Sequence, residues 1–153
     1  MGGPSSLSTT ADWASCLRAE HDALQSFLAV LENEQRTLLS GQTETLIDLA
    51  DHKTRLVEQL TQLAEQRRKL QPAPGVAPAG KEDGDSRQLW TAIRQMASRA
   101  EQLNHTNGEL IQIKLRHNQQ ALTVLHNAAQ SATLYGPDGQ ASIPVAGRTL
   151  GSV

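Results

Sequence analysis

The sequence predicts an all-α fold: an antiparallel helical hairpin plus a longer third helix, packed as a coiled-coil-like three-helix bundle with a flexible C-terminal tail. Two leucine repeats of seven residues, separated by a Ser-Gly pair, predict the hairpin. A longer amphipathic pattern after a Pro- and Gly-rich segment predicts the third helix. The 153 residues suffice for one domain, and aromatic residues make up only 3%, so the core must be mostly Leu, Ile and Ala.

The first predicted helix runs from about Asp12 to Leu39. Residues 1–11 are expected to be disordered because they are mainly Gly, Pro, Ser and Thr. The helix carries one leucine every seven residues, and further apolar residues occupy the adjoining rows: Leu17, Leu24, Leu31 and Leu38, with Trp13, Phe27 and Leu28. Ser40-Gly41 should end the helix, because glycine tolerates the left-handed conformation of a C-terminal cap.

The second predicted helix runs from about Thr43 to Leu70. Its leucines again form two rows: Leu49, Leu56, Leu63 and Leu70 in one, and Leu46 and Leu60 in the other. Lys53 and Arg67 interrupt the second row, and we expect their stems to cover apolar surface while their charges reach water. The short turn between the two helices makes them antiparallel.

The third predicted helix runs from Ser86, a candidate N-cap, to about residue 133. Residues 71–85 before it contain several Pro and Gly and should form a flexible linker. The helix has one apolar stripe with steps of three and four: Trp90, Ile93, Ala97, Ala100, Asn104, Ile111, Leu115, Asn118, Leu122, Leu125 and Ala129. An interior glycine costs roughly 1 kcal/mol, so both a continuous helix and a break near Gly108 stay open. Residues 134–153 should be a mobile tail.

The helix lengths predict an exposed stretch of the third helix. At about 1.5 Å per residue, the first two helices are each roughly 40 Å long and the third roughly 70 Å. If the linker takes the short route, helix three runs parallel to helix one, with Trp90 near Trp13. About the last 20 residues would then overrun the hairpin from near Lys114 and expose Leu115, Leu122 and Leu125. Such a stripe calls for a client, a second copy of the chain, or the folded-back tail.

Composition excludes several functional classes. The net charge of -2 leaves no basic stripe for a nucleic-acid backbone, and no apolar run is long enough for membrane insertion. The N-terminus has neither the basic start nor the apolar stretch of a secretory signal. Cys16 is the only cysteine and cannot form an internal disulfide. We therefore expect a cytoplasmic protein.

No catalytic, metal-binding or cofactor-binding site is expected. None of the five histidines lies three or four residues from another His or from Cys16, so no local helical metal site can form. No sequence signal provides Cys16 with an activating base, and we expect it to be a small core or boundary residue. The acidic pairs Asp48/Asp51 and Glu32/Glu34 should be solvated on polar helix faces, because a thin helical bundle offers little pocket to shift a carboxyl pKa.

Two polar features remain open in function. Asn104, Asn107 and Asn118 either fix the register between the helices or hydrogen-bond the backbone of a client. Pro137-Asp138-Gly139 has the residue types of a tight turn and follows Leu134-Tyr135. That turn is either a simple helix stop, or it presents Tyr135 as an interface anchor.

The same residues give the chain a resemblance to the FlgN family of flagellar export chaperones. The motifs are Leu103-Asn104-x-x-Asn107-Gly108, then His117-Asn118-Gln119-Gln120-Ala121-Leu122-x-Val124-Leu125, then Leu134-Tyr135-Gly136-Pro137-Asp138-Gly139-Gln140. Trp90 fits as well, as does the helix-two string Lys53-x-x-Leu56 with Leu60, Leu63, Arg67 and Arg68. Each string alone is weak, but their order and spacing are specific. The resemblance covers most of Asp12 to Gln140 and leaves out the linker and the extreme N-terminus.

The resemblance implies a cytoplasmic chaperone for the hook-associated proteins FlgK and FlgL that delivers them to the flagellar type III export apparatus. It implies that clients bind the C-terminal region, which corresponds here to Ile111, Leu115, Asn118, Leu122, Leu125 and Ala129. It also implies that Leu134 and Tyr135 contact the export gate protein FlhA. The alternative from the residues alone is a coiled-coil scaffold or adaptor that self-associates, for example as a homodimer, through the C-terminal half of helix three.

Overall fold

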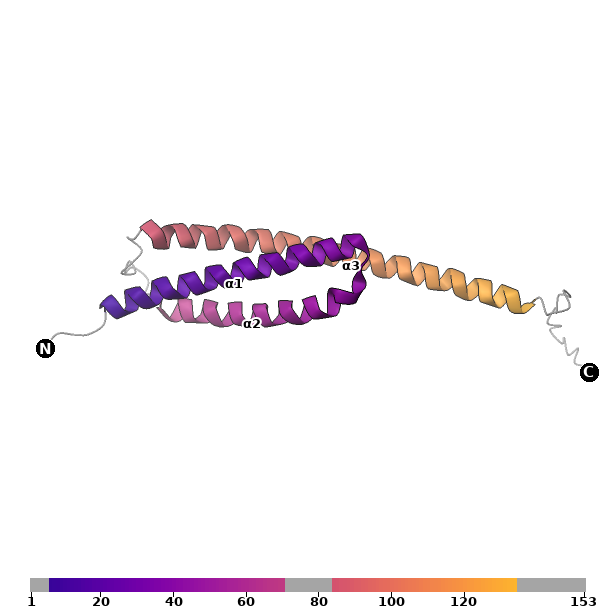
Figure 1. Ribbon diagram of the computed structural model, residues 1–153, viewed down its shortest axis with the longest axis horizontal. Coiled ribbons are helices and arrows are strands. Elements are labelled where there is room, and N and C mark those ends of the chain that lie inside the picture. Colours follow the sequence, from indigo (N-terminus) through magenta and orange to yellow (C-terminus); the bar gives the residue numbers. More distant parts are fainter. Residues whose placement is uncertain (1–5, 71–83, 135–153) are drawn as a thin grey trace, which may run out of the picture. The chain divides into compact units, whose positions relative to one another are not determined.

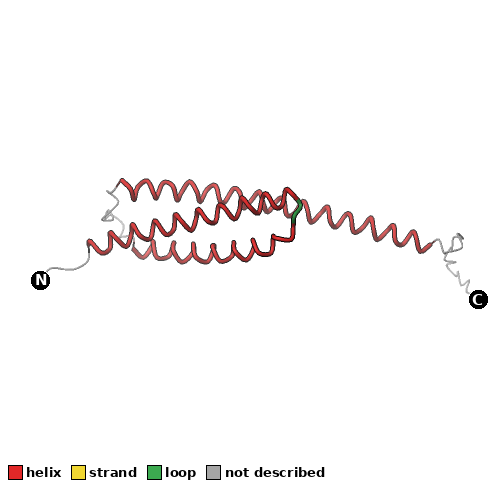
Figure 2. Tube along the Cα trace, viewed as in Figure 1, coloured by secondary structure: helices red, strands yellow, loops and turns green. Residues whose placement is uncertain are grey.

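The computed structural model describes residues 6–70 and 84–134, which form three long helices. These are α1 (Ser6–Ser40), α2 (Leu46–Leu70) and α3 (Gly84–Leu134), and a single 3-10 turn, η1 (Thr43–Thr45), precedes α2. The described part of the chain contains no strand (Figures 1 and 2). The predicted all-α class with three packed helices is confirmed.

Glycine ends α1 as predicted. Gly41 has a φ of 78°, and its N–H donates to the carbonyl oxygen of Thr37 at 3.1 Å. This is the single hydrogen bond of the left-handed C-terminal cap. The chain then reverses into α2, so that the hairpin is antiparallel: Glu34, near the end of α1, pairs with Lys53, near the start of α2 (Figure 1).

Contacts divide the chain into two compact units, Met1–Ile111 and Gln112–Val153. In the first unit, α3 runs parallel to α1: residues nearer the end of α3 contact residues nearer the end of α1. Trp90 packs against the cluster around Trp13, and Arg99 donates to Glu32. The expected proximity of Trp90 to Trp13 is therefore confirmed.

Helix α1 contributes most of the core. Its heptad leucines are all buried, and among the described residues the largest fully buried apolar side chains are three of them, Leu17, Leu31 and Leu38. In α2 only Leu56 is buried, while the other predicted leucines of its two rows are half-buried. From α3, Ile93 joins the cluster of Trp13, Leu17 and Leu24. Helix α1 is therefore the central helix of the first unit, since it packs against both α2 and α3.

Helix α3 is a single helix that continues through Gly108. A methyl group built at Gly108 would meet no atom within 4 Å, so no close approach demands glycine there. An interior glycine costs about 1 kcal/mol, which is less than the stabilisation that α3 gains from packing of the residues before Gly108. The structure thus answers the question that the sequence left open.

Several helix boundaries differ from the prediction. Helix α1 begins at Ser6 rather than Asp12, so residues expected to be disordered are helical, and α2 begins with a 3-10 turn. The predicted N-cap was wrong: Ser86 lies inside α3, which starts at Gly84, and Ser86 is buried. Serine has moderate helix propensity, and the packing of α3 on α1 includes it in the helix. Residues 71–83 and 135–153, most of the expected linker and tail, lie outside the described residues.

Candidate functional site

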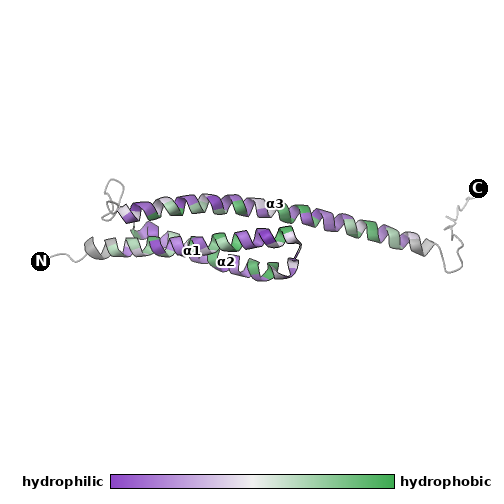
Figure 3. Ribbon diagram, turned by 45° about the horizontal axis from the view of Figure 1, so that its top comes forward, coloured by the Kyte–Doolittle hydropathy of each residue, from purple (hydrophilic) through white to green (hydrophobic). Residues whose placement is uncertain are grey.

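Large apolar side chains are exposed along the C-terminal part of α3. Leu115, Leu122 and Leu125 are 56%, 65% and 66% exposed, and Ile111 is 38% exposed. Asn118 and Ala129 from the same predicted stripe are exposed as well. Figure 3 shows hydrophobic residues continuing along α3 toward its C-terminal end. The predicted client-binding residues are thus accessible in the free chain.

These residues share one face of the helix. At 100° per residue, the six positions from Ile111 to Ala129 fall within an arc of about 80°. An amphipathic helix presents a stripe of similar width to its partner. The boundary between the two compact units, at Ile111 and Gln112, lies close to Lys114, where the cover of the hairpin was expected to end. The overrun itself stays a prediction.

Two further large apolar residues in this part of α3 are exposed outside the predicted stripe. Ile113 is 44% exposed and Val124 is 67% exposed, and neither belongs to the predicted stripe. Their spacing of eleven residues, close to three helical turns, places them on a common face and could have revealed them. The C-terminal part of α3 is therefore apolar on more than one side.

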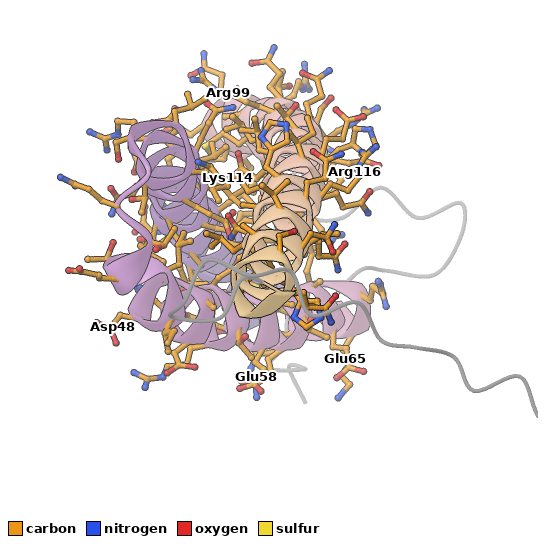
Figure 4. All side chains as sticks on the ribbon, turned by 90° about the vertical axis from the view of Figure 1, so that its right-hand side faces the viewer. Asp48, Glu58, Glu65, Arg99, Lys114 and Arg116 are labelled. Atoms are coloured by element: carbon orange, nitrogen blue, oxygen red, sulfur yellow. The ribbon has the colours of Figure 1, made fainter. Side chains whose placement is uncertain are left out.

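The same segment carries positive charge only. Lys114 and Arg116 are its basic residues, and no Asp or Glu occurs between Glu109 and Asp138. Figure 4 shows the two basic side chains on different sides of the helix. A partner with carboxylates would complement this segment.

A buried polar cluster ties all three helices of the first unit together. Lys53 of α2 donates to both carboxylate oxygens of Glu34 in α1, at 3.1 and 3.3 Å. The side-chain amide of Asn107 in α3 donates to Glu34 at 2.8 Å and to the carbonyl oxygen of Leu31 at 2.9 Å. The expectation that Glu34 is solvated was wrong, because it faces two donors from neighbouring helices and is buried.

A second polar cluster lies nearer the start of α1. Arg67 of α2 donates to Glu20 of α1 at 2.7 Å, and its guanidinium group lies 4.6 Å from the ring centre of Trp90 in α3. The expectation that Lys53 and Arg67 send their charges to water was wrong for both residues. Their side chains, 24% and 16% exposed, end on buried carboxylates of α1 instead.

The three asparagines have different surroundings. Asn107 is fully buried and holds α3 in register with α1, which confirms the register interpretation for this residue. Asn104 is exposed, as is Ala97, so both were wrongly assigned to the inward stripe between Trp90 and Ile111. Asn118 is exposed, and its hydrogen bond to a client stays a prediction.

The candidate cysteine and acidic residues have different surroundings. Burial raises the pKa of the Cys16 thiol, the carboxylate of Glu20 raises it further, and Arg67 partly opposes both. A raised pKa favours the protonated thiol, and the burial of Cys16 agrees with the predicted core or boundary position. Asp48 and Asp51 are exposed, as expected, and Glu32 is half-buried and paired with Arg99. Figure 4 shows Asp48, Glu58 and Glu65 pointing outward from α2.

Among residues 6–70 and 84–134, no group of three His, Cys, Asp or Glu side chains is placed to hold a metal ion. A cavity of about 240 Å³ between α1 and α3 is lined by Trp13, Leu17, Ser86, Arg87 and Trp90. Its lining is mostly apolar and aromatic, with Ser86 and Arg87 as its polar residues.

Only one residue of the predicted gate-binding pair belongs to the described chain. Leu134 is the last residue of α3, and Tyr135 lies outside the described residues. No described helix combines the length and the hydropathy that crossing a membrane would require.

Comparison with known proteins identifies relatives along nearly the whole chain. The family model of the FlgN protein matches residues 3–143. The flagella synthesis protein FlgN of Salmonella typhimurium strain LT2 is 35% identical over 122 residues, which cover 78% of this chain and 83% of that protein. Flagella synthesis proteins FlgN of Escherichia coli K12 (32% over 121 residues, 78% and 82% covered) and Yersinia enterocolitica (29% over 133 residues, 85% and 90% covered) are also similar. No solved structure matches the chain.

The family model extends over the hairpin, α3 and the exposed face of its C-terminal part, in agreement with the resemblance in the sequence motifs. The chain therefore belongs to the FlgN family of flagella synthesis proteins, which are non-enzymatic flagellar export chaperones.

Proposed function

We propose that the chain binds the hook-associated proteins FlgK and FlgL in the cytoplasm, prevents their premature assembly and delivers them to the flagellar type III export apparatus. An amphipathic helix of the client lies along the client face, which we define as Ile111, Leu115, Asn118, Leu122, Leu125 and Ala129. The observation that carries this proposal is the exposure of Leu115, Leu122 and Leu125 on one side of α3. Membership of the family supports the choice of flagellar clients.

Apolar burial is large enough to drive this binding. Fully burying a leucine stabilises a complex by roughly 1.5–3 kcal/mol, and three leucines of the client face are more than half exposed. Part of that gain offsets the loss of translational freedom and the ordering of the client helix. The net interaction is reversible, so competition at the export apparatus can release the client without any bond being broken.

The client face is tested by charge substitutions at matched heights along α3. Leu122→Glu with Leu125→Glu places two carboxylates in the apolar contact, and client affinity should fall at least 100-fold because those charges must be desolvated. The control pair, Gln119→Glu with Thr123→Glu, adds the same charge on the polar side of the helix, where both residues are exposed. Isothermal titration with the C-terminal segment of a hook-associated protein measures both.

Circular dichroism of both variants should equal that of the parent, because the substituted side chains are exposed. Equal affinity of the two double variants would place the client elsewhere. Loss of helical signal in the Leu122/Leu125 variant would show that this face packs within the chaperone itself.

A separate contact to the export gate protein FlhA is proposed for Leu134 and Tyr135. Tyr135 is the only tyrosine of the chain, and it follows directly on the last residue of α3. Tyrosine combines a large apolar ring with a hydroxyl group and is enriched among residues that dominate binding interfaces.

Tyr135→Ala should weaken gate binding at least tenfold and leave client affinity within a factor of two, because the client face ends before it. Truncation after Gln130 should have the same pair of effects. Both affinities are measured on each variant by titration. Equal losses would mean one shared site, and unchanged gate binding would leave Tyr135 as a helix-end residue.

Self-association through α3 is the competing function. Sedimentation equilibrium of the purified chain, alone and with the C-terminal segment of a hook-associated protein, separates the two. A chaperone gives a complex of one chain with the client segment, whereas a scaffold forms oligomers without any client.

A further inference from the structure

The segment Gln112–Leu134 of α3 has a second apolar row beside the client face. We define this second row as Ile113, His117, Ala121, Val124 and Ala128, which follow one another in steps of three and four residues. Ile113 and Val124 are 44% and 67% exposed, and the two alanines are exposed as well. Four of its five members are apolar, so this row also offers a surface for a helix.

The two rows face different directions. At 100° per residue, the second row is centred about 120° from the row of Leu115, Asn118, Leu122, Leu125 and Ala129, and each row is about 80° wide. One docked helix covers a stripe of roughly 100°. A single client helix on the client face would therefore leave Val124 in water.

The remaining face of the segment is polar from Gln112 to Gln130. Gln112, Arg116, Gln119, Thr123, Asn127 and Gln130 occupy it. A helix with two apolar rows and one polar face has the pattern of a helix that packs against two neighbours and shows its third side to water.

Charge argues that the neighbours belong to a partner rather than to further copies of this chain. Lys114 falls between the two rows, Arg116 lies on the polar face, and the segment contains no carboxylate. Two copies of this segment packed together would bring only positive charges near one another, which opposes association. A partner helix with an acidic residue opposite Lys114 gains an attractive pair instead.

We infer that one client chain supplies two amphipathic helical segments, one along the client face and one along the second row, with a client carboxylate facing Lys114. This inference rests on the proposed function and specifies the form of the client. In the complex, the C-terminal part of α3 becomes one helix of an intermolecular three-helix arrangement.

The test compares three double variants of the full-length chaperone at matched heights on α3. These are Leu122→Glu with Leu125→Glu on the client face, Ala121→Glu with Val124→Glu on the second row, and Gln119→Glu with Thr123→Glu on the polar face. The client is an intact hook-associated protein. Titration gives affinity and stoichiometry, and hydrogen exchange of the bound client identifies its protected segments.

With the parent chaperone, two separate client segments should gain protection in a one-to-one complex. The Ala121/Val124 variant should bind at least tenfold more weakly and lose the protection of one segment only, whereas the polar-face variant should behave as the parent. Parent-like affinity of the Ala121/Val124 variant, a single protected segment, or two client chains per chaperone would each overturn the inference. In each of these cases, a large loss of client affinity in the Leu122/Leu125 variant would leave the proposed function intact. Client affinity unchanged in that variant would overturn the proposed function as well.

Discussion

Single buried polar residues hold the three helices in register. Glu34 accepts hydrogen bonds from Lys53 of α2 and Asn107 of α3, and Glu20 accepts one from Arg67 of α2. An apolar seam tolerates sliding by one heptad, whereas a buried carboxylate must meet its donors at one height, since an unpaired buried charge is costly. These contacts therefore specify the alignment of the helices more than they add to stability.

Removal of the Glu34 carboxylate should destabilise the first unit strongly. Glu34→Ala leaves the ammonium group of Lys53 without its carboxylate and the amide of Asn107 with only the Leu31 carbonyl oxygen, and we expect a loss of about 3 kcal/mol in the free energy of unfolding. Asp48→Ala, at an exposed acidic position of the neighbouring helix, should change it by less than about 0.5 kcal/mol.

Urea denaturation followed by circular dichroism measures both changes. A further variant, Glu34→Gln, keeps an acceptor for Asn107 but removes the charge opposite Lys53, so its loss should fall between the other two. Similar stabilities of Glu34→Ala and Asp48→Ala would show that the cluster contributes nothing to folding.

At the scale of the helices, the two polar clusters repeat the period of the leucines. Glu20 and Glu34 are separated by two heptads, and so are Lys53 and Arg67. The ion pairs Arg67–Glu20 and Lys53–Glu34 each join α2 to α1. A side chain of α3 completes each of them: Trp90 lies against Arg67, and Asn107 donates to Glu34. The clusters thus lie on the same seam as the leucines and substitute for them at two levels of the bundle.

Two glycines with opposite roles provide a test at this scale. Gly108 lies in helical backbone with space for a methyl group, so Gly108→Ala should stabilise the chain by about 1 kcal/mol, the difference in helix propensity. Gly41 has a φ of 78°, so Gly41→Ala should destabilise it by about 1 kcal/mol, because a β-carbon is strained in the left-handed conformation.

Thermal unfolding of the two variants gives changes of opposite sign. A destabilising Gly108→Ala would mean that α3 needs a bend at that point. Client binding should be unaffected in both variants, since neither residue belongs to the client face.

At the scale of the molecule, the two compact units differ in how their apolar residues are covered. In Met1–Ile111, the heptad leucines of α1 are buried among three helices. Among the described side chains from Gln112 to Ser131, by contrast, Leu115, Leu122, Leu125 and Val124 are more than half exposed. A helix without buried apolar contacts opens locally at low free energy.

Hydrogen exchange should therefore separate the two parts of α3. In the free chain, amides of residues 112–134 should exchange faster than those of residues 93–107 by at least tenfold, because the latter are held by packing on α1 and α2. Client binding should slow exchange in residues 112–134 and leave residues 93–107 unchanged. Uniform exchange along α3 in the free chain would contradict this division, and mass spectrometry of peptides resolves it.

Local patterns in the sequence were sufficient for much of this protein. The heptad leucines of α1, the cap at Gly41 and the three helices depend on periodicity and on backbone propensity, which act over a few residues. The family motifs and the exposed leucines of the client face were also visible in the sequence. Their agreement with the fold reflects the fact that in a helical bundle most of the information is local.

Only the tertiary structure showed which polar residues pair between the helices. Lys53, Arg67 and Glu34 have the same sequence signature as solvated residues, and Asn104 and Asn107 are both plausible members of one stripe. Their environments depend on contacts between positions far apart in the chain, such as Asn107 with Leu31 and Arg67 with Glu20. Whether a polar side chain finds its partner inside or in water is a property of the packed helices, because the partner comes from another helix.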